Sequence, residues 1–463
     1  MAKPKKMLET TLKTLLASER TDALAGYSAS RLVQDRSRAL DYYNGKMDND
    51  MPVPDGRSSA VSTDVADTVE GLMPSLMEIF TAGDEVVKFE PVGPEDEQAA
   101  EQETDYVNHV FMQQNDGFMI LYQMIKDALI SKVGIVKVWS EKETKETKET
   151  YYDQPEEALM MLASNPEIEI TEHTPKENGL HDITIVQKKD VVKHKIANVP
   201  PEEFGISRSA RSIRDSGYCF HEVYKRESQA IDEGFDEEQV KALPTRNIVA
   251  TGLEALARDT VEDSVIRGGD TNTNTANRII KITEHYINMD YEGTGRACLY
   301  KVVTGGEQGD ILKRDGKLAI DEIDMMPFAA MCPIPQPHRF FGHSVADVVI
   351  EIQKIKTALT RAMLDNAYLA NNPRVEISEG GAGPNTLDDL LSVRTGGIVR
   401  TKSPGNLNVL KYPTIAGEIL PMLGYFDETR EWRTGVTRQG QGVDADALQN
   451  QSATAVNQQF TAA

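Results

Sequence analysis

One long helical pattern in the C-terminal third constrains the fold more than any other feature of the chain. Ser344 precedes the pattern and Asp347 follows three residues later, a capping box in which each side chain accepts from the other residue's backbone N–H. Asn372–Pro373 ends the pattern, because the residue before a proline disfavours helical backbone angles. The spacing predicts a helix over 344–371, roughly 40 Å long at about 1.5 Å per residue. Its apolar residues are Val345, Val348, Val349, Ile352, Ile355, Leu359, Ala362 and Met363.

This helix should have an opposite, charged face and a second helix as its neighbour. The charged residues are Glu351, Lys354, Arg361 and Asp365. A second amphipathic pattern runs from Thr414 to Arg433, and Pro421 should kink it or mark its true start. Its apolar residues near one face are Ile419, Leu423, Phe426 and Trp432. We expect Ile352 and Leu359 of the first helix to pack near Leu423 or Phe426 of the second.

Two further segments belong to the same region. Between the helices lies a short mixed segment that includes "PRVEI", a glycine turn at Gly380–Gly381 and a small helix in "NTLDDLLSV". After the second helix comes "RTGVTRQGQGVDADALQNQSATAV", residues 433–456, a loop rich in glycine and glutamine. Helical character resumes after Asp444 or Asp446, since either residue can act as an N-cap.

The N-terminal part reads as helices followed by strands. Ser62 is a predicted N-cap of a helix that passes Pro74, and a further helix opens at Pro94 and breaks at Asp116–Gly117. From Gly134 the runs "GIVKVW", "EIEITEH", "DITIVQ" and "VVKHKI" alternate like strands. The repeat "KETKETKET" between the first two is better explained as a solvated strand or hairpin tip than as a recognition tail. The chain is therefore expected to be of the α+β class.

Composition excludes several broad classes of protein. A chain of 463 residues is long enough for two or three hydrophobic cores. It lacks an apolar run of about 18 residues and a signal-peptide core, so we expect no membrane segment and a cytosol-like compartment. The three cysteines are far apart and are expected to be small core residues. The net charge of −23 argues against a general nucleic-acid binder, but it suits a protein past which DNA slides without sticking.

Motifs for catalysis are missing from the sequence. There is no P-loop, and the glycines of 304–313 and 380–385 are expected to form turns. His338 and His343 flank a Phe–Phe pair in a pattern that no metal site requires, and a packed loop is the expected structure there. We expect no enzyme activity, and no catalytic, cofactor-binding or metal-binding residues.

Two stretches resemble the portal proteins of tailed bacteriophages, in particular the short-tailed branch. They are "GHSVADVVIEIQKIKTALTRAMLDNAYLANNPRVEI" (342–377) and "RTGVTRQGQGVDADALQNQSATAV" (433–456), and the order of the segments agrees along nearly the whole chain. The resemblance implies a portal fold, and it assigns each part of that fold to a range of residues in this chain. The parts would be an α+β wing body (1–340), a first stem helix (341–371), a clip (372–412), a second stem helix (413–433), a tunnel loop (434–446) and the start of a tunnel helix (447–463). Family members continue beyond that helix, so the chain is expected to be truncated relative to them.

The resemblance also implies a function and partners. Portals are rings of twelve subunits at one capsid vertex, assembled in the bacterial cytoplasm and retained in the virion. Double-stranded DNA passes through the ring during packaging and ejection, without sequence preference. The implied partners are other copies of the chain, the terminase, tail adaptors, and the major capsid and scaffolding proteins. Asp388 and Asp389 in the clip are the candidate docking residues for the terminase.

Simple geometry gives the tunnel loop a role in such a ring. Twelve helices at a spacing of about 10 Å enclose a channel roughly 28 Å wide, whereas a B-form duplex is roughly 20 Å across. A flexible glycine-rich loop can narrow that gap and still yield to a moving strand. Arg438, Gln439 and Gln441 are the candidate residues for contacts with backbone phosphate.

Two other classes of protein stay open at this point. A head–tail adaptor or another capsid component would assemble differently and need not have paired stem helices. A nuclease or packaging ATPase would need a Walker motif or a metal-binding carboxylate cluster, and neither is visible in the sequence.

Overall fold

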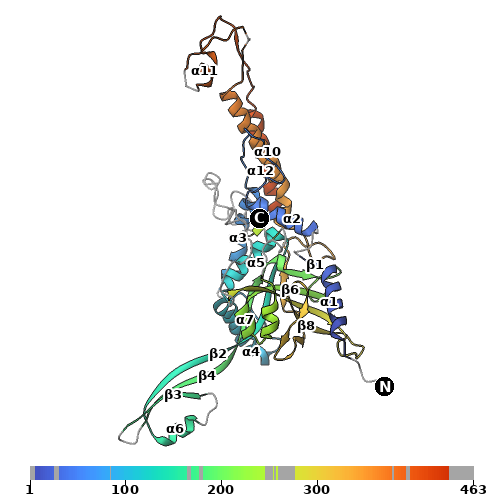
Figure 1. The fold of residues 1–463 in the computed structure, drawn as a ribbon, viewed down its shortest axis with the longest axis vertical. Coiled ribbons are helices and arrows are strands. Elements are labelled where there is room, and N and C mark those ends of the chain that lie inside the picture. Colours follow the sequence, from blue (N-terminus) through green and yellow to red (C-terminus); the bar gives the residue numbers. More distant parts are fainter. Residues whose placement is uncertain are drawn as a thin grey trace.

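The computed structural model is an elongated molecule with a broad body, a pair of long helices at one end and a β-arm that projects from the other (Figure 1). The body combines helices with antiparallel sheets, in agreement with the expected α+β class. The structure describes residues 6–25, 31–83, 85–163, 168–176, 181–245, 254, 257–258, 277–377, 380–392 and 397–436.

The N-terminal part of the body is largely helical. It comprises α1 (Glu9–Asp22), α2 (Arg31–Tyr43), α3 (Asp64–Thr81), η1 (Pro94–Asp96), α4 (Glu97–Asn108), the π-helical turn η2 (His109–Gln114) and α5 (Gly117–Ser131). Three of its helices, α2, α3 and α5, pack against the first of the long helices. The expected break lies at Asp116, whose positive φ of 50° ends the preceding helical segment. The N-cap prediction for Ser62 is wrong, because α3 is capped at Thr63 and the Ser62 hydroxyl donates to Asp64.

The larger sheet is antiparallel and follows the order β1-β5-β6-β7-β8-β12, with β9 paired to β8. Side chains of α1 and of α7 and α8 pack against its strands, and apolar residues on this sheet belong to three separate clusters. The expected turn within 304–313 is confirmed as the β8–β9 hairpin. The elements of this region are β1 (Leu24–Ala25), η3 (Pro201–Glu203), β5 (Phe204–Ile206), β6 (Tyr218–Arg226), α7 (Glu227–Asp232), α8 (Glu237–Ala242), β7 (Ile279–Met289), β8 (Cys298–Gly305), β9 (Asp310–Ile311), β10 (Lys313–Arg314), β11 (Lys317–Leu318) and β12 (Ile320–Glu322).

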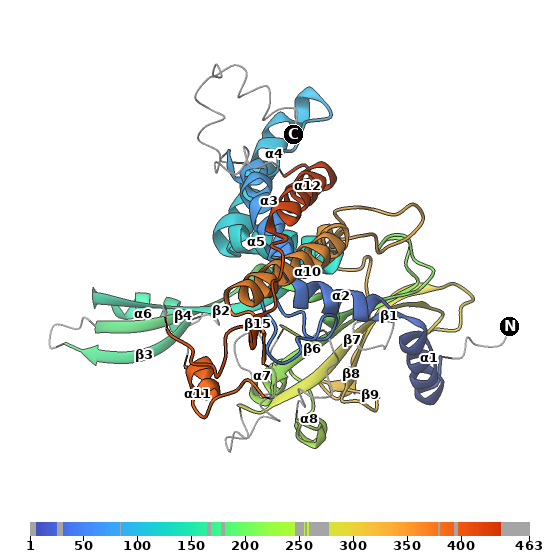
Figure 2. The same cartoon turned by 90° about the horizontal axis from the view of Figure 1, so that it is seen from above.

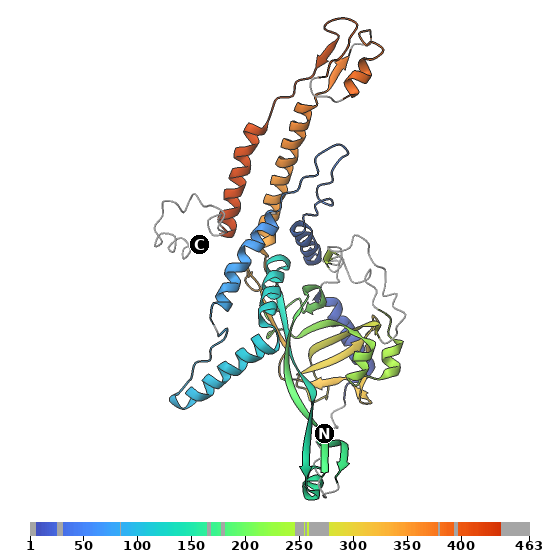
Figure 3. The ribbon, with the colours of Figure 1, turned by 90° about the vertical axis from the view of Figure 1, so that its left-hand side faces the viewer.

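The arm extends a second antiparallel sheet, of order β13-β2-β4-β3, far beyond the body (Figures 1 and 3). Its strands are β2 (Gly134–Gln154), β3 (Ile168–Pro175), β4 (His181–Val199) and β13 (Phe328–Met331), and α6 (Glu156–Ala163) lies at its tip. The prediction of a solvated strand for the charged repeat is confirmed, because β2 runs through it with exposed side chains. The prediction of two separate strands from "DITIVQ" and "VVKHKI" is wrong, since both belong to β4 and pair continuously with β2.

The two long helices are α10 (Val345–Asn371) and α12 (Ala416–Thr434), and they lie side by side (Figures 1 and 3). Both hydrogen bonds of the expected capping box are present, Ser344 N to Asp347 Oδ2 at 2.9 Å and Asp347 N to Ser344 Oγ at 3.0 Å. Pro421 lies inside α12 and does not mark its start. Beyond the helices is a small unit of β14 (Val375–Ile377), α11 (Thr386–Leu391) and β15 (Leu407–Val409).

None of the helices in the described part of the chain combines the length and the hydrophobicity needed to cross a bilayer. Viewed along the long helices, the arm, α4 and the large sheet leave the centre of the molecule in different directions (Figure 2).

Candidate functional site: the junction of the long helices with the body

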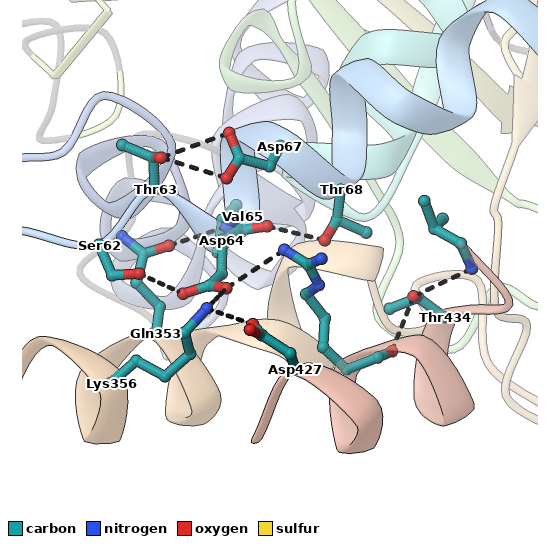
Figure 4. A network of polar contacts seen from close by, with 12 residues as sticks. Ser62, Thr63, Asp64, Val65, Asp67, Thr68, Gln353, Lys356, Asp427 and Thr434 are labelled. Carbon is teal, nitrogen blue, oxygen red and sulfur yellow. Dashed lines mark hydrogen bonds and ion pairs between the residues drawn. The ribbon is translucent and has the colours of Figure 1, made fainter. Parts of the chain in front are cut away.

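A buried carboxylate joins the body to both long helices. Asp64, the first residue of α3, is 1% exposed. Its Oδ1 accepts from Lys356 Nζ of α10 at 2.5 Å and from Arg430 Nη1 of α12 at 3.3 Å (Figure 4). Lys356 also donates to Asp427 of α12 at 2.6 Å. A helix start is a favourable place for a carboxylate because of its unpaired N–H groups, and here the same carboxylate binds cations from two other helices.

Neutral polar side chains of α10 hold the surrounding backbone. Gln353 is buried; its Oε1 accepts from Val65 N at 2.8 Å and its Nε2 donates to Tyr42 O at 3.0 Å. Thr357 Oγ1 accepts from Ser62 N at 3.1 Å. These bonds satisfy backbone groups at the end of α2 and the start of α3, where helical partners are missing. Each is worth about 1 kcal/mol, and losing one leaves a buried group unpaired.

The charged side of α10 contacts the N-terminal body. Arg361 donates to the carbonyl oxygens of Ala60 at 2.8 Å and Met51 at 2.9 Å. Asp365 accepts from Ser58 N at 2.7 Å. Glu351 accepts from Arg38 Nη2 at 3.3 Å. The extended segment before α3 thus contacts Arg361 and Asp365, whereas Glu351 stays exposed beside α2.

The apolar side of α10 is partly buried within one chain. Val349, Ile350 and Ala346 belong to the main helical core with Val65 and Val69 of α3. The four predicted stem residues differ in burial. Ile352 is 2% exposed, whereas Leu359, Leu423 and Phe426 are half-buried, and their proposed mutual packing stays a prediction.

Trp432 does not share the inward face of α12. It is 88% exposed, and Tyr425, seven residues earlier, is 64% exposed. Ile419 and Arg430 are the buried residues of this helix. The expectation that Trp432 lies near the face of Ile419 is therefore wrong, since the helical rotation of about 100° per residue places it on the opposite side. The inward position is occupied by the cation that binds Asp64.

The small unit beyond the helices contains its own ion pair. Arg400 donates from Nε to Asp389 Oδ2 at 2.8 Å and from Nη2 to Oδ1 at 2.9 Å. Hydrogen bonding by the Arg400 side chain, together with its backbone N–H, lowers the pKa of Asp389 to about 2. Asp388 is exposed. Of the two candidate docking residues, Asp389 thus has a structural contact, and Asp388 is available at the surface.

The remaining predictions concern the tunnel loop, the helix after it and the two histidines before α10. Arg438, Gln439 and Gln441, and the helix expected from 447, lie outside the described residues. Gly435 ends α12 with a φ of 72°, a conformation that glycine adopts readily. His338 and His343 are exposed, so the loop packs through Phe340 and Phe341 and not through the histidines. Among the described residues, no group of three or more metal-ligating side chains is assembled.

The sequence model of the family described as "Phage SU10 portal protein" matches residues 12–463. The chain belongs to this portal family. Among curated proteins, no match to the chain is found. The portal resemblance that rested on residues 342–377 and 433–456 is therefore confirmed, and the α+β architecture is consistent with it. As a member of this family, the portal is a structural component of the phage capsid and does not belong to a known enzyme family.

The junction of the portal was not found by sequence reasoning, although some signal was present. Gln353, Lys356 and Thr357 interrupt the apolar pattern of α10 at positions three and four apart, which puts them on one face. Such a polar row beside an apolar row indicates a helix with two different neighbours. Arg430 lies at the matching position of α12, but nothing in the sequence pairs it with Asp64, which is 366 residues away.

Proposed function

We propose that twelve copies of this portal form a ring at one capsid vertex, through which double-stranded DNA is packaged and ejected. The observation that supports this proposal most is the pair α10–α12, which the Asp64 junction ties to the body while an aromatic row on α12 stays uncovered. Large apolar side chains on an ordered helix are typical of a protein interface. A ring covers this row with the next subunit.

The names of the parts follow from the same proposal. Residues 1–340 are the wing, 341–371 and 413–433 the stem, 372–412 the clip and 434–446 the tunnel loop. Helix α10 begins four residues after the proposed start of the first stem helix and ends at its proposed end; α12 begins three residues after and ends one residue after the proposed limits of the second. The proposed phosphate contacts of Arg438, Gln439 and Gln441 rest on sequence alone.

The assembly prediction tests the function directly. Because every subunit offers the same uncovered row, we expect purified protein to form closed rings. Native mass spectrometry should give a mass of twelve chains, and negative-stain images should show a central hole. A stable monomer or dimer under mild conditions would contradict the ring. Particles without a hole and without closed symmetry would favour an adaptor or another capsid component.

A second prediction concerns the clip, where we propose that the terminase docks. Leu387 and Leu391 are exposed on the same short helix as Asp388, and Ile398 of the same unit is exposed too, so this unit offers apolar side chains together with a charge. Asp388→Arg should weaken binding of purified terminase by about tenfold, because reversing a rim charge changes complementarity while leaving the fold intact. Surface plasmon resonance on preformed rings would measure it.

The control for Asp388→Arg is a substitution of the neighbouring residue, Asp389. Asp389→Asn removes the ion pair with Arg400, so it should loosen the clip and affect binding through folding, which hydrogen exchange of residues 386–401 would reveal. Unchanged terminase binding by Asp388→Arg rings would leave the clip with a purely structural role.

A further inference from the structure

The shaft of the arm lacks a core of its own. Ile183 and Ile185 of β4 are buried near the tip, where β3 also pairs with β4. Nearer the body, from Ser140↔His194 to Glu146↔Lys188, the arm consists of β2 and β4 alone, and the β2 side chains there are exposed on both faces of the ribbon. Two-stranded ribbons are only marginally stable in water unless another surface supports them. At about 3.3 Å per residue the exposed part of β2 extends roughly 50 Å from the body. Such a ribbon is expected to lie against another surface.

The charge of the shaft differs in sign from that of the chain. Residues 140–150 and 186–195 contain seven lysines and five carboxylates, a net charge of +2, whereas the whole chain carries −23. Lys145 lies directly opposite Lys189 on the same face, and like charges at paired positions repel. Within the described part of the chain, no ion pair is formed by Lys142, Lys145, Lys148, Lys189 or Lys195.

The pattern of charges favours an acidic protein surface as the partner of the shaft. Glu141, Glu143, Glu146 and Glu149 alternate with the lysines of β2, and they would repel a polyanion such as DNA along its whole length. A protein surface can instead place single carboxylates against single lysines. Opposite charges across an interface fix its register and select its partner.

The most acidic stretch of this chain surrounds α4. Between Lys88 and Lys126 there are no lysines or arginines and eight carboxylates, which are Glu90, Glu95, Asp96, Glu97, Glu101, Glu103, Asp105 and Asp116. Glu97, Glu101 and Asp105 follow each other at intervals of four residues, so they form one exposed row on α4. None of the eight forms an ion pair within the described residues.

The arm does not reach the α4 row of its own chain. In the part of the chain that the structure describes, the two meet at the base of the arm, where the rings of Tyr106 and His194 lie 6.4 Å apart. From there the arm and α4 diverge (Figures 2 and 3). We propose that the face of the arm that carries Lys145 and Lys189 docks on the acidic α4 row of a second copy of the chain. The inference rests on the proposed ring, in which the arm would strap one subunit to another.

Charge reversal tests the strap. Lys145→Glu with Lys189→Glu should lower the fraction of chains in rings by about tenfold, because like charges then meet across the interface. Adding Glu101→Lys and Asp105→Lys to the same chain should restore the rings. The matched control, Lys142→Glu with Lys148→Glu, reverses two charges on the other face of the same ribbon and should leave the rings intact. Native mass spectrometry at fixed protein concentration measures all four proteins.

A second measurement locates the contact. Rings assembled from light- and heavy-nitrogen-labelled wild-type chains are treated with a carbodiimide, which joins lysines directly to neighbouring carboxylates. Mixed-isotope links from Lys145 or Lys189 to α4 are expected, and links confined to one isotope would overturn the proposal. If wild-type chains form no rings at all, that result contradicts the proposed ring itself, on which the docking of the arm depends.

Three other results would overturn the strap while leaving the ring in place. One is equal ring formation by wild type and Lys145→Glu/Lys189→Glu. Another is equal loss in the control variant, which would indicate that the ribbon is merely destabilised. A third is normal ring formation by the arm variant with loss of duplex DNA retention in a gel-shift assay, because nucleic acid would then be the partner.

Discussion

Replacing Asp64 with asparagine should lower the free energy of unfolding by about 3–5 kcal/mol, because removing one partner leaves buried cations uncompensated. Lys356 keeps Asp427, but Arg430 loses the carboxylate that it contacts at 3.3 Å, and its Nε has no partner among the described residues. Urea unfolding at constant protein concentration would measure the change. The loss should be visible in far-ultraviolet circular dichroism, since the junction joins three helices, α3, α10 and α12.

The control for Asp64 is one turn away on the same helix. Asp67 is exposed and hydrogen-bonds Thr63, so Asp67→Asn should change stability by no more than about 0.5 kcal/mol. If the two variants unfold at the same urea concentration, the junction does not hold the long helices to the body. The packing of Val349 and Ile350 in the main core would then carry that role.

Replacing Trp432 with alanine should abolish ring assembly and leave the subunit folded. A side chain that is 88% exposed contributes little to folding of the single chain. Buried in an interface, a tryptophan is typically a hot spot worth about 2–4 kcal/mol, and every interface of a ring would lose it at once. Native mass spectrometry should therefore show free subunits whose circular dichroism matches that of wild type.

The conservative variant separates interface contact from helix stability. Trp432→Phe keeps an aromatic ring on the same face and should still assemble, with rings that dissociate at lower protein concentration. Rings of normal stability from Trp432→Ala would show that the row of Tyr425 and Trp432 faces solvent or the channel, and the neighbouring subunit would have to be sought on α10.

The helices and strands were predictable from the sequence where chemistry within one turn of the chain decides where they begin and end. The start of α10 follows from the Ser344–Asp347 capping box and its end from Asn372–Pro373, because both signals act within one turn of the chain. The same holds for the break at Asp116 and for the charged repeat in β2. Errors arose at Ser62, where a neighbouring residue competes for the cap, and within β4, where pairing with β2 continues across a polar stretch.

The sequence by itself determined the order of the elements and, through two stretches of the stem and loop, the portal family. It could not determine which side of each long helix faces the body. Periodicity distinguishes apolar from charged rows, but burial of a charged row depends on partners that arrive from elsewhere in the chain. Only the tertiary structure brought Asp64 to Lys356 and Arg430, and it thereby decided that the Arg430 side of α12 faces the body and the Trp432 side faces away from it. The desolvation of a charge is decided by its neighbours in space, and those neighbours are set by the whole fold.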